Sequence, residues 1–214
     1  SSDVCSSDLF AVREAQGEYL LFLNNDVEII TESWLEEMLQ LCQQKDVGMA
    51  GAKLYYPDDT IQHAGVVVGL GGVAAHVLCK LPRDAEGYMG RLRCVQEISA
   101  VTAACMMVKT SVFKAVGGFD EELKVAFNDI DLCMKVRKYG VKIVFTPYAE
   151  LYHYESKSRG MEDTPEKQLR FSREVNCFRR KWERELLKGD PYYNPNLTLN
   201  NTDCSLRKQE KNGD

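Results

Sequence analysis

The chain of 214 residues lacks a long apolar run, CxxC pairs and any excess of positive charge. The stretch most like a membrane span, residues 64–79, has only 16 residues and contains four glycines and His76, whereas a spanning helix needs about 18 or more apolar residues. Lys and Arg number 27 against 32 Asp and Glu, a net charge of −5. The composition therefore argues against a transmembrane segment and against nucleic acid as the main partner.

Eight cysteines are present, but their spacing fits neither a zinc finger nor a redox pair. Several lie in apolar runs, such as Cys105 in AACMMV and Cys133 in DLCMKV, where a thiol packs as a small hydrophobic group. The sequence therefore predicts reduced thiols and a cytoplasmic protein, with peripheral contact to the inner face of a membrane left open.

The length fits one domain, and the 44% share of hydrophobic residues is usual for a globular protein. Residues 1–9, SSDVCSSDL, resemble a translated sequencing adapter, so we expect a non-native leader; an ordinary flexible leader is the alternative. We expect residues 10–188 to be the C-terminal part of a larger domain and residues 189–214 to be an extended, partly disordered tail.

Apolar strands alternate with amphipathic helices along the chain, a pattern typical of an α/β fold with a mostly parallel sheet. Continuous apolar runs such as YLLFL indicate strands buried on both faces. The strands are expected at 19–23, 47–54, 98–108, 141–145 and 150–154, and the helices at 33–42, 128–139 and 168–187.

Asn24, Asn25 and Asp26 follow the first of these strands. The carboxyl ends of strands in open α/β sheets face the crevice where ligands bind. A carboxylate beside two amides suits one ligand of Mg²⁺ or Mn²⁺ and hydrogen bonds to a sugar. A plain polar turn is the alternative, because Asn and Asp are common in turns.

Asp129 and Asp131 lie at the start of the helix expected at 128–139. An ionised carboxylate there is a candidate general base that accepts a proton from an attacking hydroxyl. The helix dipole lowers the pKa of such a carboxyl group, and burial or a second carboxylate opposes that shift. Simple helix capping is the alternative.

His153 ends the strand expected at 150–154, and Lys157 and Arg159 follow it. Neutral imidazole is a common metal ligand, and the two cationic side chains suit phosphate oxygens. A structural histidine is the alternative. The glycines at 69–72 lack the spacing of a nucleotide-binding loop.

Taken in order, these motifs resemble the family 2 glycosyltransferases, in particular the rhamnosyltransferase-like branch of O-antigen and cell-wall polysaccharide synthesis. The resemblance covers residues 10 to about 206. It is carried by AxGEYLLFLNNDVEI, VTAACMMVKTSVFKAVGGFDE, FNDIDLCMKVRKYGVKIVFTP, AELYHYES and DPYYNPNLT.

The resemblance implies a GT-A fold and an inverting transferase that uses a nucleotide-diphosphate sugar and Mg²⁺ or Mn²⁺. Asp26 corresponds to the last acid of the family's DXD-type motif, His153 to its later metal-ligand histidine and Asp129 to its base. It also implies donor-binding residues Asn24, Asn25, Lys157, Ser158 and Arg159, and substrate-pocket residues Thr102, Ala103, Phe119, Asp120, Asn128 and Asp131.

The chain also departs from the family pattern. Asn24 replaces an acid, Asn128 stands beside the base where many members have an acid, and Ala103 replaces a glycine. The family's first nucleotide-binding strands have no counterpart before Phe10, so we expect the chain alone to be inactive or feebly active. The QxxRW motif of processive synthases is missing, which favours transfer of single sugars to a glycan or lipid-linked acceptor.

Two further functions remain open. One is a non-catalytic module of the same fold that binds a carbohydrate or a protein partner. The other is a sugar nucleotidyltransferase, which would likewise use a metal site in an α/β fold.

Overall fold

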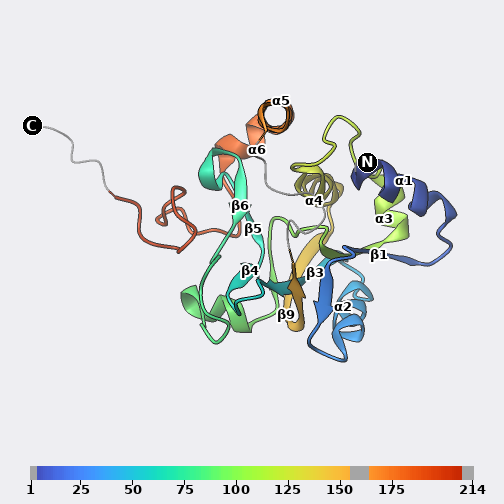
Figure 1. The fold of residues 1–214 in the computed structure, drawn as a ribbon, viewed down its shortest axis with the longest axis horizontal. Coiled ribbons are helices and arrows are strands. Elements are labelled where there is room, and N and C mark those ends of the chain that lie inside the picture. The colour runs from blue at the N-terminus through green and yellow to red at the C-terminus, as the bar shows by residue number, and fades with distance from the viewer. Residues whose placement is uncertain (1–3, 155–163, 209–214) are drawn as a thin grey trace, which may run out of the picture.

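The computed structural model describes residues 4–154 and 164–208 (Figure 1). The helical segments are α1 (Val4–Glu14), α2 (Trp34–Cys42), η1 (Leu70–Gly72), η2 (Tyr88–Arg93), α3 (Thr110–Ala115), α4 (Asn128–Tyr139), α5 (Pro165–Lys181) and α6 (Glu183–Lys188). The strands are β1 (Tyr19–Leu23), β2 (Val27–Ile29), β3 (Val47–Tyr55), β4 (Ile61–His63), β5 (Val66–Val68), β6 (Ala74–His76), β7 (Gln96–Glu97), β8 (Cys105–Lys109) and β9 (Lys142–His153).

A seven-stranded sheet forms the centre, with the order β1-β8-β3-β9-β2; β4 pairs with β3, and β7 pairs with β9. Only β3 and β9 are parallel among the paired strands of this described sheet. The expectation of a mostly parallel sheet is therefore wrong, and the sheet is mixed. The expected burial on both faces holds for β3 but not for the run YLLFL, because β1 buries only Leu20 and Phe22 and leaves Leu23 exposed. An apolar run also carries no information on strand direction.

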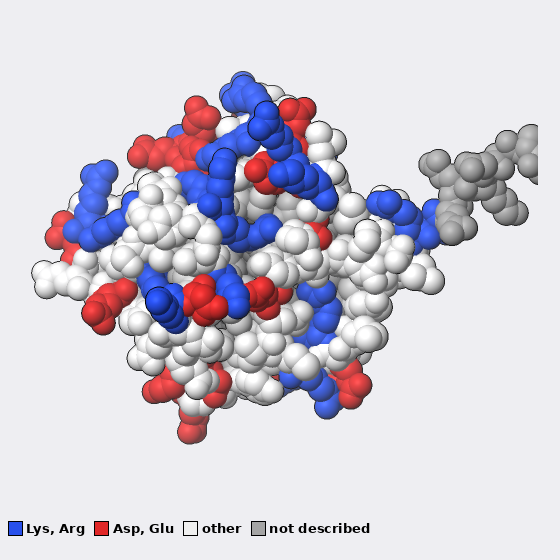
Figure 2. All heavy atoms as spheres, turned by 180° about the vertical axis from the view of Figure 1, so that it is seen from behind, with Lys and Arg blue, Asp and Glu red and all other residues white. Residues whose placement is uncertain are grey.

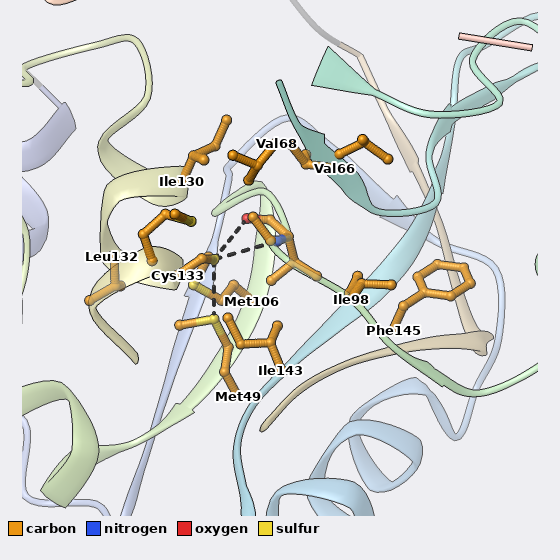
Figure 3. Close-up of a cluster of buried hydrophobic side chains, with 14 of the residues drawn as sticks. Met49, Val66, Val68, Ile98, Met106, Ile130, Leu132, Cys133, Ile143 and Phe145 are labelled. Atoms are coloured by element: carbon orange, nitrogen blue, oxygen red, sulfur yellow. Dashed lines mark hydrogen bonds between the residues drawn. The ribbon is translucent and has the colours of Figure 1, made fainter. Parts of the chain in front are cut away.

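Helices cover both faces of the sheet (Figure 1). On one face, Met38 and Cys42 of α2 are fully buried in a cluster with side chains of β3, β8 and β9. On the other face, a larger cluster lies beneath α3 and α4, and Cys133 of α4 contacts Val101 and Met49 at its centre (Figure 3). The core therefore has two parts, one on each side of the sheet.

The structure confirms the helix expected at 128–139 and closely matches the expected helix 33–42 and strand 47–54. Three other expectations are wrong. The segment expected as a strand at 98–108 contributes only residues 105–108 to a strand, as part of β8, and the helix expected at 168–187 is divided at Trp182. The two strands expected around Pro147 are one strand, β9, because Pro147 lies in a bulge where no ladder hydrogen bond is required of it.

The ends of the described chain are more ordered than the sequence indicates. Helix α1 begins at Val4, so most of the expected leader is helical. At the other end, Tyr193, Leu197 and Cys204 are buried, and residue 78 donates a backbone hydrogen bond to residue 202. Among the helices that the structure describes, none has both the length and the apolar character that crossing a bilayer requires.

The seven cysteines from Cys42 to Cys204 are free thiols. Cys42, Cys105 and Cys133 are buried, and burial raises the pKa of Cys42 and of Cys105 to about 12. A thiol with such a pKa is protonated and unreactive near neutral pH. The apolar runs thus correctly predicted cysteines that pack as small hydrophobic groups.

Glu174 of α5 holds the loop that precedes α4. The residue is 3% exposed, and its carboxylate accepts hydrogen bonds from the backbone N–H groups of Lys124 (3.1 Å), Val125 (3.2 Å) and Ala126 (2.8 Å). Phe127 follows with φ of +64°, a left-handed conformation that is strained for a side chain of this size. The three bonds to Glu174 therefore fix where α4 begins.

Gly51 in β3 permits close packing against the segment 101–104. A Cβ added to Gly51 would lie 2.3 Å from Cγ1 of Val101, which must then move. We expect Gly51→Ala to lower the free energy of unfolding by about 1–3 kcal/mol, measured by urea denaturation. Ser33→Ala is the control, because Ser33 is exposed and forms no capping bond, and a change within about 0.5 kcal/mol is expected there. Equal effects of the two substitutions would contradict the close contact.

The Glu174 contacts predict a local effect of Glu174→Gln. The amide keeps the size of the side chain but replaces one acceptor oxygen with an NH₂ group that cannot accept. We expect faster hydrogen exchange at the amides of residues 124–126 and a loss of about 1–3 kcal/mol in the free energy of unfolding. Glu166→Gln, at an exposed position in the first turn of the same helix, should change neither quantity. Unchanged exchange in Glu174→Gln would show that the carboxylate does not hold the loop.

Candidate functional site

The turn between β1 and β2 carries Asn24, Asn25 and Asp26. Backbone hydrogen bonds hold it from both sides: Asn24 N donates to Ala104 O (3.0 Å), and Tyr154 N donates to Asp26 O (2.8 Å). The polar triplet is therefore fixed between the start of β8 and the end of β9.

Asp26 and His153 come together although they are 127 positions apart in the sequence. Oδ1 of Asp26 lies 3.3 Å from Nε2 of His153, and the two side chains are 13% and 12% exposed. Asn24 Nδ2 lies 3.0 Å from the same ring nitrogen. The pairing of Val27 with His153 produces this approach, because it brings the end of β9 beside the turn.

The chemistry of the pair fits a divalent cation. With Asn24 Nδ2 as the donor, Nε2 accepts, and a carboxylate oxygen of Asp26 lies 3.3 Å from the same nitrogen. Two electron-rich groups at this separation repel unless a proton or a metal cation lies between them. Adjacent ligands of an octahedral ion with bonds of about 2.1 Å are about 3 Å apart, close to the observed distance. Among the described residues no group of three or more His, Cys, Asp or Glu could hold a metal, so the chain offers a pair of ligands here.

Asp129 lies in the first turn of α4 and points to the segment that leads into β8. Its Oδ2 accepts from the backbone N–H of Ala103 (3.2 Å), and its Oδ1 accepts from Ile130 N (2.8 Å). Ala104, the next residue, accepts from Asn24. Asp129 and Asn24, whose side chain contacts His153, therefore bond to adjacent residues of the segment 102–104.

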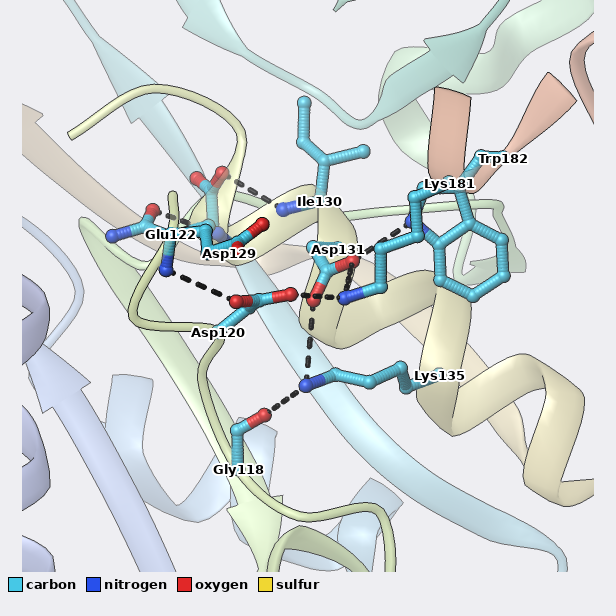
Figure 4. A network of polar contacts seen from close by, with 10 residues as sticks. Gly118, Asp120, Glu122, Asp129, Ile130, Asp131, Lys135, Lys181 and Trp182 are labelled. Atoms are coloured by element: carbon cyan, nitrogen blue, oxygen red, sulfur yellow. Dashed lines mark hydrogen bonds and ion pairs between the residues drawn. The ribbon is translucent and has the colours of Figure 1, made fainter. Parts of the chain in front are cut away.

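Asp131 faces away from this segment. Two residues along a helix correspond to a rotation of about 200°, and its carboxylate is fully buried beneath α5 (Figure 4). Trp182 Nε1 donates to Oδ1 (2.8 Å), and Lys181 Nζ and Lys135 Nζ lie 2.8 and 3.3 Å from its two oxygens. The geometry gives Asp131 a structural role in joining α4 to the C-terminal helices.

Asp120 belongs to the same ion-pair network through Lys181. Burial raises the pKa of the Asp120 carboxyl group, but the hydrogen bond from Lys181 and the ammonium charge outweigh it, so the net shift is downward. Phe119 is buried against the rings of Phe22 and Phe113. The structure therefore does not bring Phe119, Asp120 or Asp131 to the Asp26–His153 pair.

The remaining predicted residues fall into three groups. Thr102 and Ala103 lie in the segment beside Asp129, and the Asn128 side chain accepts from Asp129 N (2.7 Å). Asn25 is exposed at the turn. Lys157, Ser158 and Arg159 lie outside the described residues.

Sequence reasoning missed Gln62 and His63 in β4. Gln62 Oε1 lies 2.7 Å from Nδ1 of His153. His63 is fully buried 3.1 Å from Nδ1 of His76, and its Nε2 lies 3.5 Å from Thr102 N. Burial lowers the pKa of His63 well below its ordinary value, and the charges of His76 and His153 lower it further. The sequence feature that could have indicated them is the pair of adjacent polar residues inside the apolar segment IQHAGVVV. Polar groups buried in such a segment need hydrogen-bond partners.

Related sequences indicate a family. The profile of a glycosyltransferase-like family matches residues 3–174. The chain is 56% identical over 197 residues to the uncharacterized protein y4gI of Sinorhizobium fredii, covering 92% of this chain and 22% of that protein. It is 40% identical over 206 residues to the O-antigen biosynthesis protein RfbC of Myxococcus xanthus, covering 96% of this chain and 16% of that protein. The chain thus spans about a fifth of the length of these relatives.

A shorter match, 36% identity over 62 residues, links 29% of the chain to 20% of a Mycobacterium tuberculosis N-acetylglucosaminyl-diphospho-decaprenol L-rhamnosyltransferase. The fold is similar to that of GalNAc-T7 in complex with UDP, GalNAc and Mn²⁺, with a TM-score of 0.62, 13% identity and coverage of 87% of this chain and 36% of that one. It is also similar to the mannosyltransferase PcManGT of Pyrobaculum calidifontis with GDP-Man and Mn²⁺, with a TM-score of 0.54, 14% identity and coverage of 84% and 43%. The fold is thus that of GT-A glycosyltransferases, and because the family profile spans most of the sequence, the chain belongs to the glycosyltransferase-like family.

Proposed function

We propose that the chain is part of an inverting glycosyltransferase that moves a sugar from a nucleotide-diphosphate donor to an acceptor hydroxyl in bacterial surface polysaccharide synthesis. The observation that carries the proposal is the 3.3 Å approach of Asp26 and His153 beside the segment that contacts Asp129. The O-antigen and rhamnosyltransferase relatives, and the two neighbours with nucleotides and Mn²⁺, support it.

In this proposal Asp26 and His153 hold Mg²⁺ or Mn²⁺ on the donor diphosphate. When bound, such a cation acts as a Lewis acid that stabilises the leaving nucleoside diphosphate. Asn24 Nδ2 donates to the same Nε2 lone pair, so when a cation takes that lone pair the amide would turn to a diphosphate oxygen or the ribose.

Asp129 is the proposed base. Two backbone N–H groups orient its carboxylate, which is half-buried at the start of α4. It accepts the proton of the acceptor hydroxyl as that oxygen bonds to the anomeric carbon, while the bond from this carbon to the diphosphate breaks on the opposite face. Attack opposite the leaving group inverts the anomeric centre.

The acceptor proposed is a glycan or a lipid-linked sugar. In Figure 2, Lys and Arg side chains gather at the end of the molecule where Figure 1 places α5 and α6. Helix α5 carries six basic residues, of which Lys181 is paired with Asp120 and Asp131. Such a basic surface suits an anionic acceptor or a peripheral contact with acidic lipid headgroups. The six are Lys167, Arg170, Arg173, Arg179, Arg180 and Lys181.

The activity is proposed for a protein of the relatives' length. Because the chain spans 22% and 16% of y4gI and RfbC, we propose that the 214 residues by themselves turn over slowly or not at all. Transfer of single sugars is proposed rather than processive synthesis.

Asp129→Asn in the longer protein tests the base role. We expect turnover to fall by about 10²–10⁴-fold, because the amide cannot accept the proton, while donor binding is retained. Glu121→Gln, an exposed acid near the same loop, is the control and should retain turnover. Steady-state kinetics and donor titration measure the two quantities. Unchanged turnover in Asp129→Asn would remove this residue from the base role.

Asp26→Asn tests the metal role. We expect weaker Mn²⁺ binding in titrations followed by electron paramagnetic resonance, because a neutral amide attracts the cation less than a carboxylate does. Asp84→Asn, at an exposed position in a loop, is the matched control and should bind Mn²⁺ as the unaltered chain does. Equal Mn²⁺ affinity of the two variants would contradict the proposed metal site.

A further inference from the structure

The side chain of Gln62 contacts His153 at two places. Gln62 Nε2 donates to the carbonyl oxygen of His153 (3.2 Å), and Gln62 Oε1 lies 2.7 Å from ring nitrogen Nδ1. A carbonyl oxygen can only accept, so the nitrogen end of the amide must face it. The oxygen end is thereby assigned to the imidazole.

This assignment fixes the tautomer of His153. An amide oxygen cannot donate, so the proton of the 2.7 Å contact belongs to Nδ1 of the imidazole. The neutral ring then carries its lone pair on Nε2. Asn24 Nδ2 lies 3.0 Å from that nitrogen as a donor, which agrees with the same tautomer.

The position of Gln62 is itself constrained. The residue is 4% exposed and lies in β4, which β3 holds by antiparallel pairing. Its backbone oxygen accepts from Cys79 Sγ (2.9 Å) and lies 3.1 Å from Nδ1 of His76. The amide therefore presents a fixed acceptor to the ring.

We infer that Gln62 is a positioning residue of the candidate metal site, which holds His153 in the Nδ1–H tautomer so that Nε2 faces the cation position beside Asp26. The inference rests on the metal role proposed for His153. On this inference the segment IQHAG, residues 61–65, belongs to the site together with the turn between β1 and β2 and the end of β9. Groups that orient a histidine ligand in this way commonly affect metal affinity 10–100-fold.

Gln62→Met in the 214-residue chain tests the inference, because methionine has nearly the same shape and neither hydrogen bond. The chain contains only three histidines, so nitrogen-15 NMR resolves the tautomer of each ring without any metal. We expect His153 to be Nδ1–H in the unaltered chain and to gain a large Nε2–H population in Gln62→Met. Mn²⁺ affinity should fall about 10-fold or more.

Gln40→Met is the matched control, at an exposed position on α2, and should change neither the tautomer nor the affinity. Gln62→Glu keeps an oxygen for Nδ1 but cannot donate to the carbonyl of His153. It should retain the Nδ1–H proton, and it supplies the same readout if Gln62→Met does not fold. An unchanged tautomer in Gln62→Met, or loss of the Nδ1–H proton in Gln62→Glu, overturns the inference.

His153→Ala separates this inference from the proposed function. If His153→Ala weakens Mn²⁺ binding while Gln62→Met does not, the metal role of His153 stands and the positioning role of Gln62 is overturned. If His153→Ala leaves Mn²⁺ binding unchanged, the proposed metal site itself fails, whatever the tautomer in Gln62→Met.

Discussion

The pairing of β9 with β3 on one side and with β2 on the other is the interaction on which the candidate site depends. The antiparallel pairing with β2 carries His153 to the turn that holds Asp26. The parallel pairing with β3 brings the end of β9 beside β4, where Gln62 meets the imidazole. Each contact of His153 is therefore set by backbone pairing between segments far apart in the sequence, and the site is as rigid as the sheet.

The sequence predicted the parts of the site that follow a local rule. Asp26 and His153 stand at strand ends and Asp129 at a helix start, and the structure has a strand or helix boundary at each of them. Gln62 follows no such rule, because its role depends on the pairing of three strands that no local pattern encodes. The direction of the strands was mispredicted for the same reason: an apolar run reports burial, whereas the direction is set by how the chain connects the strands.

Asp129 and Asp131 show how helix geometry separates two similar carboxylates. Both lie in the first turn of α4, but Asp129 faces the segment 102–104 and is half-buried, whereas Asp131 is enclosed by two ammonium groups and an indole N–H. Removing one partner from such a buried group leaves an unpaired charge, which costs several kcal/mol. The i, i+4 spacing of Asp131 and Lys135 was the sequence signal for this structural role.

The bulge around Pro147 decides which face of the sheet the end of β9 presents. Gly51 pairs with Phe145, but Lys53 pairs with Glu150, so β9 contains three extra residues over this interval. Before the bulge, Phe145 packs into the cluster beneath α3 and α4; after it, Ala149 and Leu151 pack into the cluster beneath α2. Since side chains alternate along a strand, an odd number of extra residues reverses the alternation. Without the bulge, Leu151 and His153 would both point to the opposite face of the sheet, and His153 would meet neither Asp26 nor Gln62.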